Sequence, residues 1–279
     1  MQRPSGLRRT LAVAGAAITC VASAQEEVPF ITTPDTVTLA MLQLAGVGPT
    51  DRVVDLGSGD GRIVITAARR FGARGLGVEI VPELVLQSRR HAQTAGVADH
   101  AEFRVQDLFA TDLRGFSVVT MYLLPEVNLQ LRPRLLALPA GTRVVSHDWD
   151  MGEWAPDRTL TLDVPNKAIG REKKSSVHMW VVPAAVQGLW CTVGAQLDVT
   201  QRFQAFSATL QTHGVAAPVM VFDGRIQGTA LKATGPVGEP RAELYLQGDT
   251  LHLQRAAAPA VGYEGRRFTR AGHSGCVGG

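Results

Sequence analysis

Short apolar runs alternate with amphipathic stretches in the part of the chain before residue 183. Runs typical of buried strands cover 52–56, 75–79, 101–105, 117–122 and 142–146. Apolar residues at helical spacing cover 37–44, 63–71, 82–95 and 127–137. Strand–helix alternation of this kind predicts an α/β fold, in which helices cover both faces of a parallel sheet. Two further runs, over 159–164 and 177–182, predict a closing pair of strands.

The pattern changes after Pro183. Residues 186–256 show short alternating stretches separated by glycines, without a convincing amphipathic helix, and predict a small antiparallel β module. We expect turns in this module at Asp223-Gly224 and Gly248-Asp249. Residues 257–279 are rich in Gly, Ala and Arg without periodicity, so we predict a disordered tail there.

Residues 1–24 have the pattern of an export signal. They hold three arginines and no acidic residue, then an apolar stretch over 11–21, which is short for a membrane span. They end on Ala22-Ser-Ala24, a pattern typical of signal cleavage. We therefore expect an exported protein, periplasmic or secreted, without a membrane span in the mature chain. If translation starts near residue 25 instead, the protein would be cytoplasmic.

The charge balance depends on this signal. The whole chain has 28 basic and 25 acidic residues, and loss of the three signal arginines leaves 25 of each. A neutral mature chain argues against a strong electrostatic interaction with nucleic acid, so we expect no strong nucleic-acid binding.

Two cysteines, Cys191 and Cys276, remain after signal removal and lie far apart in the sequence. They have neither metal-ligand spacing nor a C-x-x-C arrangement, so no metal site is predicted. We interpret both as incidental, while a disulfide between them stays open if the protein reaches an oxidising compartment.

The strongest chemical signal is the segment Asp55-Leu-Gly-Ser-Gly-Asp-Gly61, which follows a predicted strand and precedes a predicted helix. The loop residues are Gly57, Ser58, Gly59, Asp60 and Gly61. Glycines at this spacing allow a tight turn and let a ligand approach the backbone. A dinucleotide site has its third glycine one position later, where this chain has Arg62, so the spacing counts against an NAD-dependent dehydrogenase.

Two more acidic residues follow the next two predicted strands. Glu79 ends the first of them, and Asp107-Leu108 comes after the second. Ligands of open α/β sheets bind at the carboxyl ends of the strands, so we expect Asp55, Glu79 and Asp107 to face one ligand. A carboxylate at the position of Glu79 can accept both hydroxyls of a ribose, and Asp55 suits an ammonium group.

Together with Thr33-Pro34, these motifs resemble a family of small class I S-adenosylmethionine-dependent methyltransferases. The family includes the mitochondrial protein-lysine methyltransferases and related bacterial and archaeal proteins, and the resemblance covers roughly residues 30–183. It implies a Rossmann-like domain, which we place at 25–183, and S-adenosyl-L-methionine as cofactor. The residues that it assigns to the cofactor are Thr33, Asp55, Gly57, Ser58, Gly59, Asp60, Gly61, Glu79, Asp107 and Leu108. In the resembling enzymes, the aspartate at position 107 faces the adenine amino group.

The sequence does not fix the methyl acceptor. After the fourth predicted strand the chain reads Met121-Tyr-Leu-Leu-Pro125, without the Asn-Pro-Pro-Tyr signature common among enzymes that methylate amino groups. We expect methyl transfer to an unidentified acceptor, with a protein lysine amino group as one candidate. The alternative is an exported protein on the same fold that binds the cofactor, or a partner, without turnover.

A lysine acceptor must lose a proton before it attacks the methyl group. Tyr122, His147 and Asp148 are the candidate catalytic residues, because they follow the fourth and fifth predicted strands. His147 could act as a general base, or it could be a rim histidine that only holds a loop.

Overall fold

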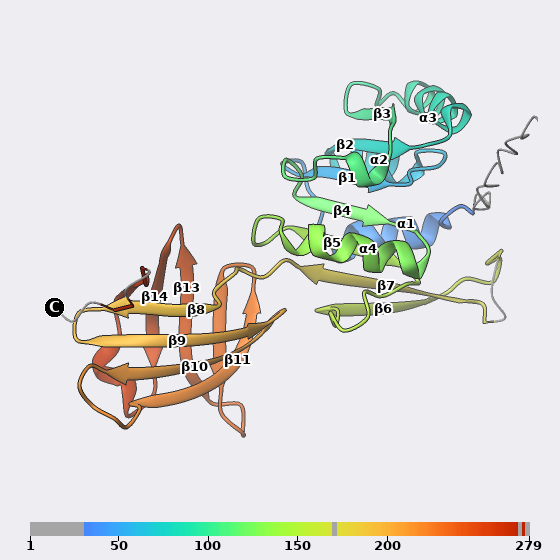
Figure 1. Cartoon of the computed structure of the whole chain (residues 1–279). Coiled ribbons are helices and arrows are strands. Elements are labelled where there is room, and N and C mark those ends of the chain that lie inside the picture. Colours follow the sequence, from blue (N-terminus) through green and yellow to red (C-terminus); the bar gives the residue numbers. More distant parts are fainter. Residues whose placement is uncertain (1–30, 169–171, 273–274, 277–279) are drawn as a thin grey trace, which may run out of the picture. The chain divides into compact units, whose positions relative to one another are not determined.

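The computed structural model describes residues 31–168, 172–272, 275 and 276. The export signal predicted over 1–24 lies outside the described residues. The chain forms a seven-stranded sheet with helices, followed by a closed barrel of strands (Figure 1). This confirms the predicted α/β fold with a following antiparallel β module.

The first sheet has the strand order β3-β2-β1-β4-β5-β7-β6. Its strands are β1 (Arg52–Leu56), β2 (Arg74–Glu79), β3 (Ala101–Val105), β4 (Val118–Met121), β5 (Arg143–His147), β6 (Arg158–Asp163) and β7 (Lys174–Val181). The first five strands run parallel, and β7 pairs antiparallel with both β5 and β6. Each of these strands was predicted to within three residues at either end.

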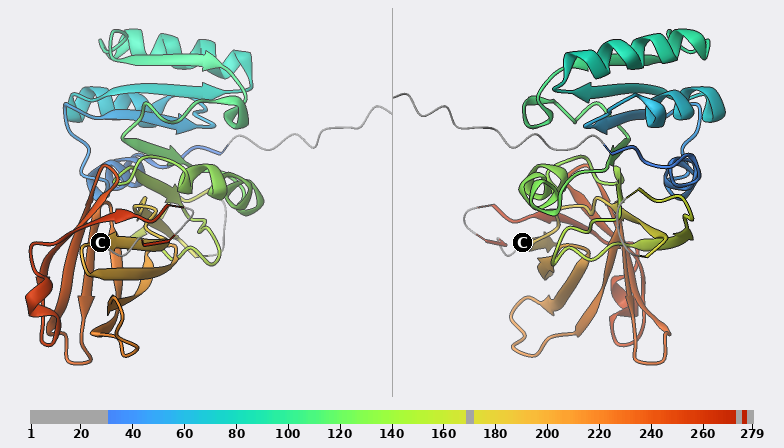
Figure 2. Two further views of the ribbon diagram at one scale, coloured as in Figure 1. Left: turned by 60° about the vertical axis from the view of Figure 1, so that its left-hand side comes forward. Right: turned by 90° about the vertical axis from the view of Figure 1, so that its right-hand side faces the viewer.

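Helices cover both faces of this sheet (Figure 2). They are α1 (Asp35–Leu44), α2 (Arg62–Phe71), α3 (Pro82–Thr94) and α4 (Pro125–Leu136), with a short 3-10 helix, η1 (Leu108–Ala110), between β3 and β4. Both α3 and α4 begin at a proline, whose fixed φ and missing N–H suit the first turn of a helix. None of the helices in the described residues is long and apolar enough to cross a membrane.

The two faces of the sheet carry separate apolar cores. On one face, Val53 and Val118 belong to a core with residues of α1 and α2. On the other, Val54 and Val119 belong to a core with Leu131 of α4. Burial on both faces explains why β1 and β4 appear in the sequence as continuous apolar runs.

The second sheet is an antiparallel barrel in which each strand pairs with the next and the last pairs with the first. Its strands are β8 (Gly188–Thr192), β9 (Ala195–Arg202), β10 (Ala205–Thr212), β11 (Met220–Gln227), β12 (Ala230–Thr234), β13 (Pro240–Gln247), β14 (Thr250–Ala256) and β15 (Arg267–Arg270). Trp190, Phe206, Phe222, Leu244 and Phe268 are buried in its core. Eight strands enclose an interior just wide enough for side chains to fill, so the barrel is a packed core.

The turn predicted at Asp223-Gly224 is wrong, because both residues lie within β11. A Cβ atom on Gly224 would lie 2.2 Å from the carbonyl oxygen of Lys232 and 2.7 Å from the Phe206 ring. This glycine therefore allows a close approach of neighbouring strands. The turn predicted at Gly248-Asp249 is present between β13 and β14.

The disordered tail predicted over 257–279 is also wrong for its described part. That segment contains the 3-10 helix η2 (Ala260–Tyr263) and β15, which pairs with both β14 and β8 and so closes the barrel. A strand of four residues is too short to show periodicity, and its conformation is set by its two neighbours. Beyond it, Cys276 forms a disulfide with Cys191 of β8, so the interpretation of these cysteines as incidental is wrong.

Candidate active site

The predicted ligand loop joins the carboxyl end of β1 to the start of α2. Gly57, Gly59 and Gly61 all have positive φ angles, of 73°, 52° and 82°, a region that side chains rarely adopt. A Cβ atom on Gly61 would lie 2.7 Å from the ring of Phe103 and 2.8 Å from Ser88. The glycines therefore set the path of the loop and let α2 begin against the sheet.

Asp55 is buried at the end of β1, with only 2% of its surface exposed. The Thr120 hydroxyl donates a hydrogen bond of 2.7 Å to its carboxylate. Burial raises the pKa of Asp55 to about 7; the Thr120 bond acts in the opposite direction, while the Glu79 and Asp60 carboxylates add to the rise. A carboxylate under these conditions is stabilised by a cation placed beside it.

Glu79 holds the loop from the neighbouring strand. One of its carboxylate oxygens accepts the Gly59 N–H at 3.1 Å. The other accepts the N–H groups of Ile80 and Val81, at 2.8 Å and 3.1 Å. The structure thus brings Glu79 against the loop, and its role in ribose binding stays a prediction.

Asp107 lies next to this strand end, because the N–H of Gln106 donates to the Glu79 carbonyl oxygen at 2.9 Å. The Asp107 side chain caps η1 by accepting the Phe109 N–H at 2.8 Å. Leu108 is the first residue of η1. The three acidic residues therefore lie at or just beyond the carboxyl ends of three neighbouring strands.

The buried Ser58 hydroxyl has no hydrogen-bond partner among the described residues. Its oxygen lies in the middle of the loop, where a Cβ atom on Gly77 would come within 2.6 Å of it. Buried polar atoms in native proteins almost always have a partner. The Ser58 hydroxyl is thus packed beneath the loop, against β2.

Asp60 is engaged by Arg62, a residue for which the sequence predicted no role. The Arg62 guanidinium donates to Asp60 at 2.6 Å and to the Thr33 carbonyl oxygen at 2.8 Å. Burial opposes ionisation of Asp60, but the hydrogen bonds and charge of Arg62 outweigh it and lower the pKa of Asp60. The position of Arg62, two residues after Asp60, was the one feature of the sequence that could have indicated this ion pair.

The candidate catalytic residues Tyr122 and His147 lie together, with ring centroids 4.0 Å apart. His147 is only 1% exposed, and its two ring nitrogens lie 3.2 Å from the Thr33 hydroxyl and 3.0 Å from the Ser175 hydroxyl. Burial lowers the pKa of His147 to about 4, although the Asp148 charge acts against this, so the ring is neutral near pH 7. With both nitrogens occupied, His147 is placed to orient its neighbours.

Asp148 follows His147 in a left-handed conformation, with φ of 63°. One carboxylate oxygen lies 2.7 Å from the Lys167 ammonium, and the other accepts the Ser176 N–H at 3.0 Å. A non-glycine residue in this region is strained, and such strain is found preferentially at functional sites. No spacing in the sequence pointed to Lys167, since the loop between β6 and β7 brings it here.

Tyr122 is the polar residue of this cluster that remains available to a ligand. Burial and the Asp148 charge raise its pKa, so its hydroxyl stays protonated near neutral pH. Its neighbour Leu123 lies against the ligand loop, because a Cβ atom on Gly57 would come within 2.9 Å of the Leu123 side chain. Tyr122 thus lies beside His147, and the next residue along the chain, Leu123, contacts the ligand loop.

Known proteins share this part of the chain. A family model described as the ANTKMT methyltransferase domain matches residues 55–158. A protein-lysine N-methyltransferase of Saccharolobus islandicus is 40% identical over 141 residues, which cover 50% of this chain and 88% of that protein. The chain belongs to this family of class I, S-adenosylmethionine-dependent methyltransferases. The methyltransferase is therefore an enzyme, and the alternative of a binding protein without turnover is not favoured.

A mammalian lysine methyltransferase and a bacterial crystal structure are also similar to this chain. The methyltransferase is 41% identical over 111 residues to the adenine nucleotide translocase lysine N-methyltransferase of Mus musculus; the match covers 39% of this chain and only 48% of that relative. A crystal structure of an RNA methyltransferase from Salinibacter ruber, bound to S-adenosyl-L-homocysteine, is 52% identical with a TM-score of 0.52. That match covers 56% of this chain and 96% of the solved one.

S-adenosyl-L-methionine is the cofactor, as predicted, and the residues at the loop fit it. Its ammonium and sulfonium groups are cations, which the buried Asp55 carboxylate and the nearby Glu79 favour. The glycines of the loop have no side chains and adopt positive φ angles, so the cofactor can approach the backbone closely. The assignments of Asp55 to the ammonium group, Glu79 to the ribose and Asp107 to the adenine stay predictions.

Gly61→Ala is expected to lower the free energy of unfolding by about 2–4 kcal/mol, because it adds both backbone strain and a clash with Phe103. Gly46→Ala is the matched control: Gly46 also has a positive φ, of 61°, but an added Cβ meets nothing within 4 Å. That control should lose only about 1 kcal/mol. Urea unfolding of both variants measures the difference, and equal losses would contradict the close packing at Gly61.

Cofactor affinity is expected to rise as pH increases toward 7, because Asp55 must be ionised to bind a cation. The rise should approach tenfold per pH unit well below the pKa of Asp55 and level off above it. In the absence of cofactor, the free energy of unfolding changes with pH in the opposite direction. The folded state keeps the Asp55 proton that the unfolded chain releases near pH 4, so stability falls as pH rises toward 7.

Calorimetric titration with S-adenosylmethionine between about pH 5.5 and 7.5 measures this dependence. Asp55→Asn should bind more weakly, and its affinity should lose the pH dependence. Asp112→Asn, which changes an exposed acid paired with Arg114, should keep it. A wild-type affinity that does not change across this range would show that Asp55 does not face the cofactor cation.

Proposed function

We propose that the methyltransferase transfers its methyl group to a lysine amino group of a protein. The observation that carries this proposal is the 40% identity to a protein-lysine N-methyltransferase across 88% of that protein's length. The mouse relative, also named for a lysine substrate, supports it. The neutral balance of charges in residues 25–279 agrees with a protein acceptor better than with a polyanionic one.

The chemistry divides between cofactor and protein. The bound cofactor supplies a methyl group on a positively charged sulfur, and transfer forms an N–C bond as the S–C bond breaks. The protein positions the two partners and excludes water, which accounts for much of the acceleration in such displacements. The acceptor nitrogen must first release a proton, and it needs polar oxygens around it while it does so.

The Tyr122–His147–Asp148 cluster has the groups for this task. The Asp148 carboxylate already holds one lysine ammonium group, that of Lys167, so this side of the sheet accommodates an ammonium. The Tyr122 ring lies beside His147, and the negative charge of Asp148 acts on the Tyr122 hydroxyl. We assign Tyr122 to contact with the acceptor amine, and His147 to holding Tyr122 and the Thr33 segment in place.

The acceptor is tested with methyl-labelled S-adenosylmethionine and a cell extract, divided into protein and RNA fractions. Label recovered as methyl-lysine after acid hydrolysis of the protein is the expected result. Tyr122→Phe should lower kcat by up to about tenfold, as expected for the loss of one hydrogen bond to the acceptor, and leave cofactor affinity unchanged. Label confined to RNA would replace this proposal with the activity for which the Salinibacter ruber structure is named.

We also propose that the protein matures in an oxidising compartment outside the cytoplasm. The signal pattern of residues 1–24 supports this, and so does the disulfide between Cys191 and Cys276, which are 85 residues apart in the sequence. Disulfides persist in exported proteins and are rare in the cytosol.

Chain entropy gives a disulfide of this span a stabilising effect of up to about 4.6 kcal/mol. A reductant is therefore expected to lower the unfolding midpoint of the wild-type protein and to leave the Cys191→Ser/Cys276→Ser variant unchanged. In cells, fractionation should recover the chain outside the cytoplasm with both cysteines oxidised. Recovery in the cytoplasm with free thiols would contradict the proposed location.

A further inference from the structure

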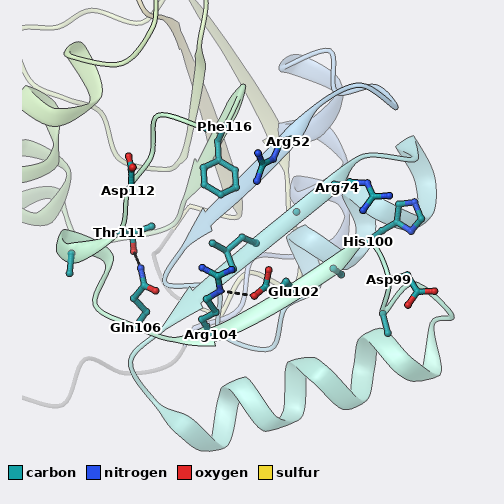
Figure 3. Close-up of a pocket in the computed structure, with 16 residues that line it drawn as sticks. Arg52, Arg74, Asp99, His100, Glu102, Arg104, Gln106, Thr111, Asp112 and Phe116 are labelled. Carbon is teal, nitrogen blue, oxygen red and sulfur yellow. Dashed lines mark hydrogen bonds and ion pairs between the residues drawn. The ribbon is translucent and has the colours of Figure 1, made fainter.

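A hollow lies on the sheet away from the cofactor loop. It begins at the amino ends of β1 and β2, follows β3, and has a volume of about 830 Å³ (Figure 3). Small-molecule sites in proteins are commonly pockets of about 300–1,000 Å³. None of the loop residues 57–61 lines it, so this pocket is distinct from the cofactor site.

The pocket exists because part of one sheet face has no helix over it. The face that carries Val54 and Val119 is covered by α4. Leu76 of β2 and Glu102 of β3 continue that face, being in register with Val54 and with each other. The connections before β3 and between β3 and β4 line this part of the face, and none of the lining residues belongs to the helices α1 to α4. Leu76 is buried, so the hollow opens over Glu102 and the edge strand β3. Parallel strands are normally covered on both faces, so the part without a helix is a place for a ligand.

Basic side chains form a row at the amino end of the pocket. Arg52 and Arg74 are register partners on neighbouring parallel strands, so their side chains lie on the same face. His100 follows on the next strand, where its carbonyl oxygen accepts the Gly75 N–H, and Figure 3 shows its ring beside Arg74. Like charges directly opposite each other in a sheet are destabilising, and an anion between them removes that cost.

The two arginines of this row have no carboxylate partner. Neither Arg52 nor Arg74 forms an ion pair with any residue that the structure describes. The Arg52 guanidinium instead lies 5.2 Å from the centre of the Phe116 ring. Both arginine side chains are therefore free to bind a ligand.

The acidic residues around the pocket do not cancel this charge. Glu102 is paired with Arg104 at 2.6 Å, and Asp112 is paired with Arg114 at 2.8 Å. Asp99 is the remaining acidic residue of the lining. After these pairings the pocket has two free arginines and one free carboxylate, and hence a surplus of positive charge.

We propose that this pocket binds a phosphate-bearing small molecule. Arg52 and Arg74 bind the phosphate, since guanidinium groups match phosphate oxygens with paired hydrogen bonds. A ring N–H of His100 donates a further hydrogen bond. The body of the ligand lies along β3, beside the Phe116 ring.

Titrations with inorganic pyrophosphate and with ribose 5-phosphate, followed by phosphorus NMR at constant ionic strength, test this assignment. Arg52→Gln/Arg74→Gln is expected to weaken binding of both probes at least tenfold. Arg69→Gln/Arg70→Gln is the matched control, because it removes two exposed arginines from the end of α2 and should leave binding unchanged. Cofactor affinity, measured in parallel, should be the same in both variants and shows that they are folded.

Three results would overturn the proposal. The first is that neither probe binds the wild-type protein. The second is that both double variants lose affinity equally, which would reflect general charge attraction. The third is binding to phosphatidylcholine vesicles containing phosphatidylglycerol that depends on Arg52 and Arg74 while both soluble probes fail, which would assign the row to a lipid headgroup.

Discussion

The Asp55 carboxylate is held inside the protein with one hydroxyl partner, from Thr120, and with two other carboxylates nearby. Burying a charged group without a counter-ion is costly, and here the cost appears as a pKa raised to about 7. Of the two neighbouring acidic residues, Asp60 forms an ion pair with Arg62, whereas the carboxylate oxygens of Glu79 accept hydrogen bonds from backbone N–H groups. The edge of the sheet is therefore short of positive charge until the cofactor binds, which gives the site its preference for a cationic ligand.

Thr33 connects the two halves of the site. Its carbonyl oxygen accepts from Arg62, beside the cofactor loop, and its hydroxyl lies 3.2 Å from His147, beside the proposed acceptor position. A shift of this segment would change the surroundings of both Asp60 and Tyr122. Because His147 is buried and neutral, it can keep this arrangement over the ordinary pH range without changing its charge. The residue with the strongest resemblance to a general base is thus better suited to positioning.

The parts of the fold that could be predicted from sequence are those whose signal is local. β1 and β4 are buried on both faces and appear as apolar runs, and the loop from Asp55 to Gly61 has glycines at three positions with positive φ, where other side chains are strained. Where conformation depends on distant neighbours, prediction failed. β15 has four residues and is a strand because β14 and β8 flank it. Gly224 looked like a turn, but serves the close approach of two strands.

The same limit applies to the site. Asp55, Glu79 and Asp107 could be predicted because parallel strands bring their carboxyl ends to one edge, so order in the sequence becomes proximity in space. Lys167 reaches Asp148 only through the loop between β6 and β7, and no spacing rule relates the two. The burial of both His147 nitrogens depends on Thr33 and Ser175, which lie 114 and 28 residues away along the chain.

Charge is distributed unevenly along the central strands. β1 starts at Arg52 and has Asp55 near its carboxyl end, and β2 starts at Arg74 and ends at Glu79. At roughly 3.3 Å per residue, the two ends of β2 are about 16 Å apart. This exceeds the Debye length of about 8 Å at physiological salt, so charges at one edge are largely screened through solvent from those at the other. The amino edge can therefore attract an anion without weakening the attraction of the carboxyl edge for the cofactor cation. Any coupling between the two sites has to pass through the packed residues of β1 and β2, such as Leu76 and Val78, and not through the electrostatic field.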